Sequence, residues 1–264
     1  MREKLGQHFL INKKAISKII VALDLQKNDT VVEIGPGEGA LTLPLAEKCQ
    51  NPNSECQIIA VEKDKTLARE LAMKLPQIKM LEGDILKLLP QLVIDLSLEI
   101  GHLKLVGNIP YYITGKLLRI LGELDRKPGT IVLTIQREVA ERLCERPPKM
   151  NLLAASVQIW AKPEIIGRLA PSDFSPPPEV RSAIIKLESR IQNLESKASN
   201  DYYKLIKALF KQPRKTVLNN LSTGLGITKA KTLELLKKAG LNGDERPQNL
   251  DLGVLIELST LISK

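Results

Sequence analysis

Cysteine and histidine are scarce in this sequence of 264 residues. It contains three cysteines, Cys49, Cys56 and Cys144, and two histidines. An odd number of cysteines without C-x-x-C spacing fits neither a disulfide framework nor a zinc site, and two histidines without ligand spacing predict no metal site. We therefore expect the reducing environment of the cytosol, and a cytoplasmic location.

Long apolar stretches are also missing. No run of about 18 apolar residues occurs, which argues against a transmembrane helix. The first residues, 1–4, are not followed by the apolar stretch of a secretory signal. We therefore expect neither a membrane-spanning segment nor a signal peptide. The hydrophobic content of 43% is ordinary for a globular protein and predicts a packed core.

Acidic side chains are too few to balance the basic ones. The chain has 39 Lys and Arg against 30 Asp and Glu, a net charge of +9. Residues 197–264 hold 12 basic and 6 acidic side chains, so this last quarter carries +6 of the +9. Such an excess favours a polyanionic partner, for example a nucleic acid. A solvated, lysine-rich helical surface is the alternative interpretation.

The first two thirds of the chain alternate short apolar runs with longer helical patterns. Runs that are apolar throughout are typical of strands buried on both faces of a parallel sheet. The predicted strands are residues 30–34, 57–61, 78–81, 103–106 and 130–135, and the predicted helices include residues 40–48, 65–74 and 114–124. Later apolar runs at 154–160, 165–169 and 183–187 are expected to supply an antiparallel pair at the sheet edge. This order predicts a doubly wound, Rossmann-like α/β fold.

The last quarter of the chain has helical patterns only. Residues 189–200 are polar and predict a linker. A helix is expected over 229–239, with Gly240 as its C-cap, and Asp251 is placed to cap a final helix. We therefore expect two domains, a sheet domain over residues 1–190 and a small all-helical domain over residues 191–264.

A glycine-rich segment, Gly35-Pro36-Gly37-Glu38-Gly39, joins the first predicted strand to a helix. Glycines at alternate positions let the backbone turn sharply and approach a ligand closely. The pattern also fits a dinucleotide fingerprint, and alone it cannot choose between cofactors. Because Glu33 and Glu38 flank the loop, and no Lys or Arg lies in it, the segment suits a positively charged nucleoside better than a pyrophosphate.

Polar side chains end the next three predicted strands. Glu62 and Asp84 follow the second and third strands, and Asn108 follows the fourth. The carboxyl ends of parallel strands lie at one edge of a sheet, where ligands bind in this class of fold. Glu62 can accept both ribose hydroxyls of a nucleoside, and Asp84 can accept a hydrogen bond from an adenine amine. Each acid alone can instead be a helix N-cap.

The segment Asn108-Ile109-Pro110-Tyr111 can hold a flat base by its amino edge and its face. The side-chain carbonyl of Asn108 can accept a hydrogen bond from an exocyclic amine, and Tyr111 can stack on the ring. A structural turn that ends the strand is the alternative. Only 3% of the residues are aromatic, so rings beside proline-rich turns stand out. Phe174 is expected to stack on the other face of the base or, alternatively, to anchor its loop in the core. For Tyr112, packing on the sheet and contact with substrate remain open.

These residues together resemble the ribosomal RNA adenine dimethyltransferases of the KsgA type, which act on small-subunit RNA. The resemblance covers nearly the whole chain. It is carried by Gly6-Gln7-His8-Phe9-Leu10, Glu33-Ile34-Gly35-Pro36-Gly37, Asn108-Ile109-Pro110-Tyr111 and Phe174-Ser175-Pro176-Pro177-Pro178. One departure is that only five residues precede Gly6, whereas many relatives begin with a longer basic arm.

The resemblance implies a methyltransferase domain over residues 1–190 and an RNA-binding domain over 191–264. It implies that S-adenosylmethionine lies against six residues: His8, Leu10, Gly35, Glu62, Asp84 and Asn108. Two neighbouring adenosines in the 3′-terminal hairpin of 16S ribosomal RNA would each receive two methyl groups, with Asn108, Tyr111 and Phe174 around the reacting base. Lys211, Arg214 and Lys215 match the family's basic segment and would position RNA through its phosphates. The expected partner is the small ribosomal subunit, bound by a monomer.

The sequence is also compatible with three other functions. One is the related macrolide-resistance methyltransferase, which modifies one adenosine of large-subunit RNA. The others are a non-catalytic RNA-binding assembly or transcription factor that has kept the fold, and an NAD-dependent dehydrogenase.

Overall fold

The computed structural model describes residues 7–51, 55–96, 102–190 and 196–263. Two compact units are present, one of residues 1–140 and 162–189 and the other of residues 141–161 and 190–264. The second unit thus includes a segment, 141–161, that precedes the domain boundary expected at residue 190. The pairs Tyr202 Oη–Ala155 O, at 3.0 Å, and Arg190 Nε–Gln158 O, at 2.9 Å, are among the hydrogen bonds that join this segment to the C-terminal part.

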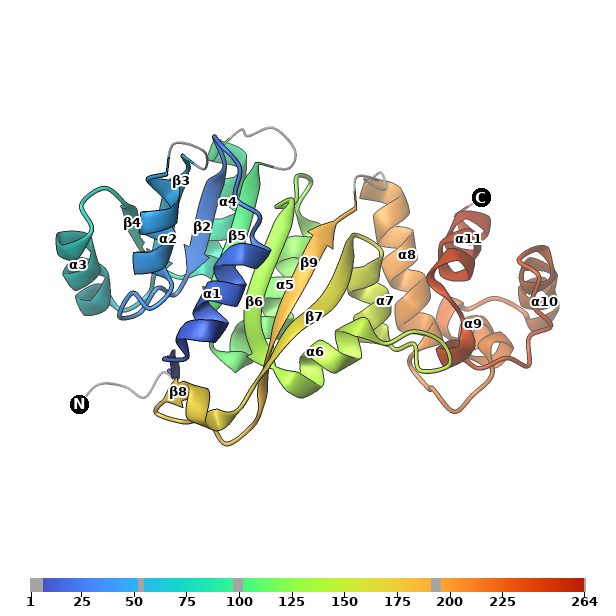
Figure 1. Ribbon diagram of the computed structural model, residues 1–264. Helices are drawn as coiled ribbons and strands as arrows, with labels where there is room; N and C mark the ends of the chain where they lie inside the picture. The colour runs from blue at the N-terminus through green and yellow to red at the C-terminus, as the bar shows by residue number, and fades with distance from the viewer. Residues whose placement is uncertain (1–6, 52–54, 97–101, 191–195, 264) are drawn as a thin grey trace. The chain divides into compact units, whose positions relative to one another are not determined.

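The first unit is built on a seven-stranded sheet in the order β4-β3-β2-β5-β6-β9-β7 (Figure 1). Its strands are β2 (Thr30–Ile34), β3 (Gln57–Glu62), β4 (Lys79–Glu82), β5 (Leu103–Asn108), β6 (Thr130–Gln136), β7 (Ala161–Leu169) and β9 (Ser182–Ser189). From β4 to β6 all neighbours are parallel, and β9 is antiparallel to β6. The chain moves outward from β2 to β4 and then returns to place β5 on the other side of β2. The α/β prediction is confirmed, and β2 and β5 form a topological switch point.

Helices lie on both faces of this sheet (Figure 1). They are α1 (Lys13–Ala22), α2 (Thr42–Cys49), α3 (Lys65–Lys74), α4 (Ile85–Leu96), α5 (Thr114–Glu123) and α6 (Arg137–Cys144), with short 3-10 turns η1 (Tyr111–Ile113) and η2 (Pro171–Asp173). A two-stranded antiparallel ribbon of β1 (Phe9–Leu10) and β8 (Phe174–Ser175) pairs Leu10 with Phe174. Asn12 begins α1 by accepting from the amides of Lys14 and Ala15, as an N-cap residue does.

The second unit is helical in its described residues. It contains α7 (Leu152–Gln158), α8 (Ser196–Leu209), α9 (Val217–Leu225), α10 (Lys229–Lys238), η3 (Pro247–Asn249) and α11 (Leu252–Ile262). Gly240, with φ of +73°, follows the end of α10 in the left-handed conformation predicted for it. The side chain of Asp251 caps α11 by accepting from the amide of Val254, as the sequence predicts. No described helix is both long and apolar enough to cross a membrane.

Two local predictions are wrong. Residues 154–160 were expected to form a strand, but the structure has α7 there, capped by Asn151, whose side chain accepts from the amide of Ala154 at 3.0 Å. A short apolar run buried on all sides has the same pattern in a helix as in a strand, so periodicity could not decide. The predicted linker over 189–200 is shorter than expected, because β9 extends to Ser189 and α8 begins at Ser196; residues 191–195 lie outside the described part.

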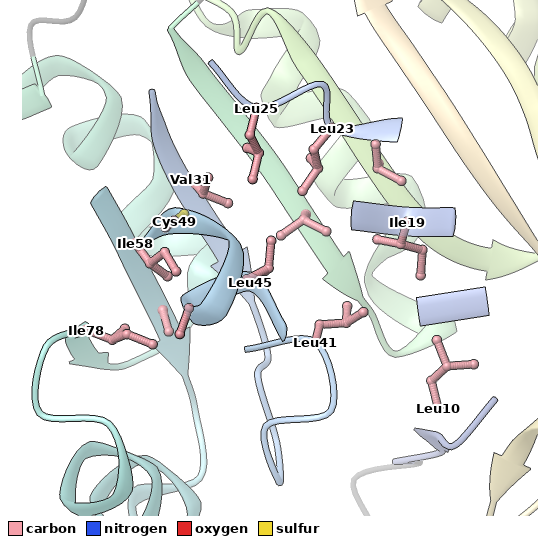
Figure 2. Close-up of a cluster of buried hydrophobic side chains, with 14 of the residues drawn as sticks. Leu10, Ile19, Leu23, Leu25, Val31, Leu41, Leu45, Cys49, Ile58 and Ile78 are labelled. Carbon is pink, nitrogen blue, oxygen red and sulfur yellow. The ribbon is translucent and has the colours of Figure 1, made fainter. Parts of the chain in front are cut away.

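The core of the first unit packs α1 and α2 against one face of the sheet. Figure 2 shows Leu10, Ile19, Leu41 and Leu45 between the helices and the strands that carry Val31 and Ile58. Leu23, Leu45 and Val31 are fully buried. Burying an aliphatic side chain of this size contributes about 1.5–3 kcal/mol, so this layer holds the strand ends in register.

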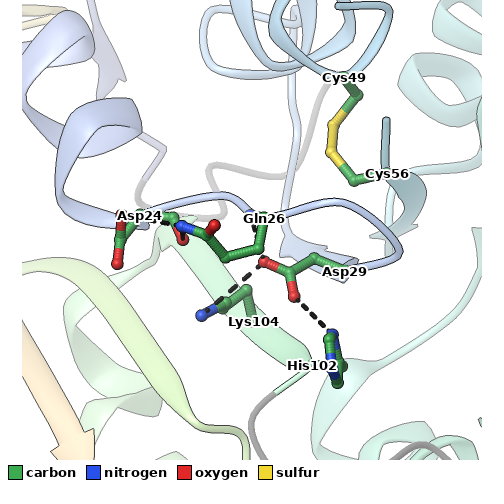
Figure 3. Close-up of polar contacts among 7 residues, drawn as sticks. All are labelled: Asp24, Gln26, Asp29, Cys49, Cys56, His102 and Lys104. Atoms are coloured by element: carbon green, nitrogen blue, oxygen red, sulfur yellow. Dashed lines mark hydrogen bonds and ion pairs between the residues drawn. A yellow bond between two sulfur atoms is a disulfide. The ribbon is translucent and has the colours of Figure 1, made fainter. Parts of the chain in front are cut away.

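The cysteine prediction is also wrong, because Cys49 and Cys56 form a disulfide (Figure 3). Cys49 ends α2 and Cys56 precedes β3, and the return of the chain between them brings their Cα atoms to 4.9 Å, within the range of a disulfide. The spacing of the two cysteines in the sequence does not show that their Cα atoms lie this close together. The disulfide removes the cysteine argument for a reducing compartment.

A buried charge cluster lies at the amino edge of the same sheet (Figure 3). Asp29 is 1% exposed, and it lies 3.1 Å from His102 Nδ1 and 3.8 Å from Lys104 Nζ. Its carboxylate also accepts from the amide of Gln26 at 2.8 Å. The cluster joins the start of β2 to the start of β5, at the edge opposite the carboxyl ends of the strands.

Candidate active site

A cavity opens at the carboxyl edge of the sheet, beside the ends of β2 and β5. It holds about 1130 Å³ of atom-free space, part of it open to solvent. Glu33 on β2, Glu62 at the end of β3, Asp84 after β4 and Asn108 at the end of β5 all line it. His8, Leu10, Gly35 and Tyr111 line it as well. The structure therefore brings together all six residues expected around the cofactor, although they come from five separate segments.

Gly37 is the point of closest approach in the glycine-rich turn. It has φ of +55°, and a Cβ atom there would lie 2.7 Å from Cε1 of Phe9. Its amide donates to Oε2 of Glu62 at 3.0 Å. Any larger residue would push against Phe9 and strain the backbone, so this turn depends on glycine. Phe9 was not singled out from sequence, although it belongs to the motif that carries the resemblance; Gly6 of that motif lies outside the described residues.

Glu62 is held by two backbone amides. Its second oxygen, Oε1, accepts from the amide of Asp64 at 2.9 Å, and the residue is 4% exposed. Asp64, not Glu62, caps α3 by accepting from the amides of Thr66 and Leu67. The N-cap alternative therefore does not apply to Glu62. A carboxylate has about four acceptor positions, so two remain for a ligand in the cavity.

Asp84 accepts from a backbone amide at the start of the next helix and also lines the cavity. Its Oδ1 accepts from the amide of Leu86 at 3.0 Å, a bond of the N-cap kind at the start of α4. Its Oδ2 lies 3.7 Å from Nζ of Lys63. Asp84 thus makes the N-cap contact that the sequence left open, and it is also a residue of the cavity wall.

Glu33 departs from the sequence interpretation, which treated it as a carboxylate that repels phosphate. The residue is 1% exposed, and its Oε2 has no hydrogen-bond partner in the described structure. Burial is the main cause that raises the pKa of Glu33 to about 8; Thr42 opposes the rise and the charge of Glu62 adds to it. At neutral pH most molecules therefore carry a neutral Glu33. Glu38 is exposed and does not line the cavity.

Asn108 is oriented by the N-terminal segment. Its Nδ2 donates to the main-chain oxygen of His8 at 2.7 Å, across 100 residues of sequence. This bond uses one of the two N–H donors of the amide, so the side-chain carbonyl and the second N–H remain for a ligand. His8 is held in turn, with Nδ1 2.8 Å from the oxygen of Pro176. One hydrogen bond thus anchors the side-chain amide of Asn108, a residue that lines the cavity.

Tyr111 is fixed at both its hydroxyl and its ring. Its Oη lies 2.6 Å from Oγ of Ser182, and its ring is stacked with that of His8 at a centroid distance of 6.1 Å and an angle of 24°. Partial burial raises the pKa of Tyr111, which Ser182 opposes, so the hydroxyl stays protonated at neutral pH. A neutral ring held at the end of β5 can form one side of a base-binding site.

For Phe174 and Tyr112 the sequence left two positions open. Phe174 is 3% exposed, belongs to the core cluster with Leu10 and Leu41, and does not line the cavity. A ring in that position cannot stack on a base, so the anchoring alternative describes Phe174 in this structure. Tyr112 does not pack on the sheet: it is 67% exposed and lines the cavity.

The basic segment of the second unit lies in the turn between α8 and α9. Lys211, Arg214 and Lys215 are all exposed there. Asn220, which the sequence did not single out, is 5% exposed and donates from Nδ2 to the main-chain oxygens of Gln212 and Lys215 at 3.0 and 3.2 Å. A buried amide thus braces a turn whose charged side chains face water. No signal in the sequence alone marks this role of Asn220.

Among the described residues, no group of three or more His, Cys, Asp or Glu side chains could hold a metal ion.

The sheet order, the cavity at the switch point and the helical C-terminal part define an α/β methyltransferase. The crystal structure of a dimethyladenosine transferase from Plasmodium falciparum is similar, with a TM-score of 0.75 and 25% identity over 95% of this chain and 96% of that chain. The fold of the 23S rRNA methyltransferase ErmE matches with a TM-score of 0.73 at 24% identity, covering 97% of this chain and all of that one.

Sequence comparison narrows the class to one family. The profile described as Ribosomal RNA adenine dimethylase matches residues 1–263. A Ribosomal RNA small subunit methyltransferase A from Dehalococcoides mccartyi is 38% identical over 255 residues, which cover 95% of this chain and 84% of that protein. A protein of the same name from Koribacter versatilis is 34% identical over 281 residues, which cover all of this chain and 95% of that protein. The chain belongs to the ribosomal RNA adenine dimethylase family.

Proposed function

We propose that this protein transfers methyl groups from S-adenosylmethionine to the exocyclic amines of two adjacent adenosines in the 3′-terminal hairpin of 16S ribosomal RNA. Each adenosine receives two methyl groups while the small subunit is assembled. Family membership supports the reaction and the RNA. The observation that carries the proposal is the anchored amide of Asn108, whose carbonyl is left for an amine in the cavity.

The cavity has the properties that S-adenosylmethionine requires. The Gly37 turn admits close approach, and Glu62 keeps acceptor positions for ribose hydroxyls. Asp84 and Asn108 offer acceptors at strand ends on the same edge, and Glu33, whose Oε2 has no hydrogen-bond partner, is a residue of the cavity wall. When bound, S-adenosylmethionine supplies a methyl group that is already activated on a sulfonium. The residues therefore need only bind, orient and exclude water.

The target amine is a weak nucleophile because its lone pair is delocalised into the adenine ring. Hydrogen bonds from the amine to Asn108 Oδ1 and to a main-chain oxygen favour a pyramidal nitrogen. The main-chain oxygen of Ile109 or of Pro110 supplies the second acceptor; that of Pro110 accepts from the amide of Ile113 at 3.1 Å and keeps one of its two acceptor positions. No strong general base is required in this arrangement.

Holding the base in the cavity requires that it first leave its stack in the RNA, which costs a few kcal/mol. Tyr111 offsets part of this cost, because stacking on an aromatic ring contributes about 1–3 kcal/mol. Its hydroxyl bond to Ser182 fixes the ring plane before the base arrives. Lys211, Arg214 and Lys215 hold the phosphates of the RNA and carry no base specificity.

The experiment offers purified small and large ribosomal subunits from an undermethylated strain to the protein, with labelled S-adenosylmethionine. Label is expected in the small subunit, in dimethyladenosine at two adjacent positions. Label in the large subunit would favour the macrolide-resistance reaction instead. Binding of NAD but not of S-adenosylmethionine, measured by calorimetry, would favour the dehydrogenase.

Three variants separate the proposed roles. Asn108→Ala is expected to abolish transfer, whereas Glu62→Ala weakens cofactor binding and Tyr111→Ala mainly lowers kcat. Unchanged methyl incorporation by Asn108→Ala would contradict the proposed chemistry and revive the RNA-binding assembly factor. Unchanged turnover by Tyr111→Ala would remove the stacking role.

A further inference from the structure

Tyr112 lines the cavity, and its side chain is largely exposed to solvent. It is 67% exposed, although the residues on both sides of it are held: Tyr111 by Ser182, and Ile113, which is 9% exposed, by the oxygen of Pro110. The backbone of η1 is therefore fixed, and an aromatic ring projects from it toward solvent.

Exposure alone is not informative, because single apolar side chains often lie at protein surfaces. The exposed large apolar side chains of the described chain are Ile11, Val21, Leu43, Met73, Ile94, Tyr112, Leu152 and Val180. Of this set, Tyr112 is the one that also lines the cavity. Its ring therefore borders both the reaction site and the surface over which the rest of a substrate must lie.

One cationic side chain, Lys63, lines the cavity, and two others, Lys116 and Arg181, are close in sequence to residues of the site. Lys116 lies four residues after Tyr112, where η1 continues into α5, and it is exposed. Arg181 is exposed and precedes Ser182, the residue bonded to Tyr111. Lys63 lines the cavity with an exposed side chain. This charge is complementary to the phosphates on either side of a base in the cavity.

The geometry points to Tyr112 as the binding platform for the nucleotide next to the one in the cavity. This inference rests on the proposed function, because only an RNA substrate has a neighbouring base. When one adenosine enters the cavity, its neighbour loses a stacking partner and lies at the rim. The ring of Tyr112 replaces that partner, and Lys116 neutralises an adjacent phosphate. The same contact presents the second adenosine near the cavity after the first has been methylated.

Kinetics on undermethylated small subunits test this role. A stacking contact made equally in the ground state and the transition state changes KM but not kcat. Tyr112→Ala is expected to raise KM for the subunit roughly five-fold or more, the factor that corresponds to the lower end of base–aromatic stacking. Tyr112→Phe and Tyr112→Trp should retain KM near that of the wild type. Met73→Ala, which removes a side chain that is 76% exposed on α3, is the matched control and should change nothing.

A second arm asks whether the contact is with the neighbouring base. Subunits whose 16S RNA carries uridine in place of one of the two adenosines stack less well, so kcat/KM of the wild type at the other adenosine should fall. Tyr112→Ala should be less sensitive to this replacement, and the difference is the coupling between ring and base. Equal sensitivity of both proteins would overturn the inference.

Three further outcomes are decisive. A change in S-adenosylmethionine affinity for Tyr112→Ala, with unchanged KM for the subunit, would place the ring against the cofactor and overturn the inference. If the wild type transfers no label to small subunits, the proposed function fails, and the inference fails with it. Active wild type with unaltered kinetics in Tyr112→Ala overturns the inference alone.

Discussion

Replacing Glu33 by glutamine is expected to change how the stability of the protein depends on pH. Burial raises the pKa of Glu33 from its ordinary 4.5 to about 8 in the folded protein. Between these two values the unfolded chain releases a proton that the folded chain keeps. Stability therefore falls as pH rises from 4.5 to about 8, and it becomes independent of this group above that range.

The magnitude follows from the size of the pKa change. Each pH unit between the two pKa values corresponds to about 1.4 kcal/mol, so the rise in the pKa of Glu33 corresponds to at most roughly 5 kcal/mol. Glutamine keeps nearly the same shape and cannot ionise. The difference in unfolding free energy between Glu33→Gln and the wild type should grow in favour of the variant as pH rises, and level off above pH 8.

The assay is urea unfolding followed by far-UV circular dichroism at pH values from 5 to 9. Comparing differences between proteins cancels the other titrating groups. Glu38→Gln is the matched control, because Glu38 is an exposed acid in the turn that follows β2, five residues after Glu33. Parallel pH curves for the wild type and Glu33→Gln would refute the reasoning, since they would mean that Glu33 ionises alike in both states.

Three other perturbations have direct readouts. Gly37→Ala places a Cβ 2.7 Å from the ring of its neighbour in β1 and should weaken S-adenosylmethionine binding about ten-fold or more by calorimetry; unchanged affinity would show that the turn has room to spare. Reducing the disulfide between Cys49 and Cys56 should lower the free energy of unfolding by about 2 kcal/mol in urea titrations, and the double serine variant should not respond to the reductant. Reversing the charge of Arg214 and Lys215 should weaken binding to small subunits and flatten its dependence on salt; an unaltered salt slope would remove this segment from the RNA-binding surface.

The candidate site was predictable where it depends on strand ends. Glu62, Asp84 and Asn108 each follow an apolar run, and parallel strands place all their carboxyl ends at one edge. The local sequence therefore predicts that these side chains share a cavity. It could not show that Asn108 donates to the oxygen of His8, because the two residues are 100 positions apart.

Features that depend on distant contacts were missed or left open. The helix α7 was predicted as a strand because its apolar run is buried whichever structure it adopts. The pairing of Cys49 with Cys56 depends on how α2 returns to β3. Phe174 precedes a run of prolines and Tyr112 follows Pro110. Phe174 is nevertheless buried in the core, whereas Tyr112 is exposed and lines the cavity. Residue type alone does not distinguish a ring that anchors from a ring that binds.

The amino-acid sequence by itself determined the α/β order, the family and the side chains at the strand ends, because hydrophobic periodicity and short motifs are properties of neighbouring residues. Only the tertiary structure decided that burial raises the pKa of Glu33, that the Asn108 amide donates to the main-chain oxygen of His8, and that Tyr112 lines the cavity. Ionisation and orientation depend on the solvent and partners that surround a group, and these are set by segments far apart in the chain.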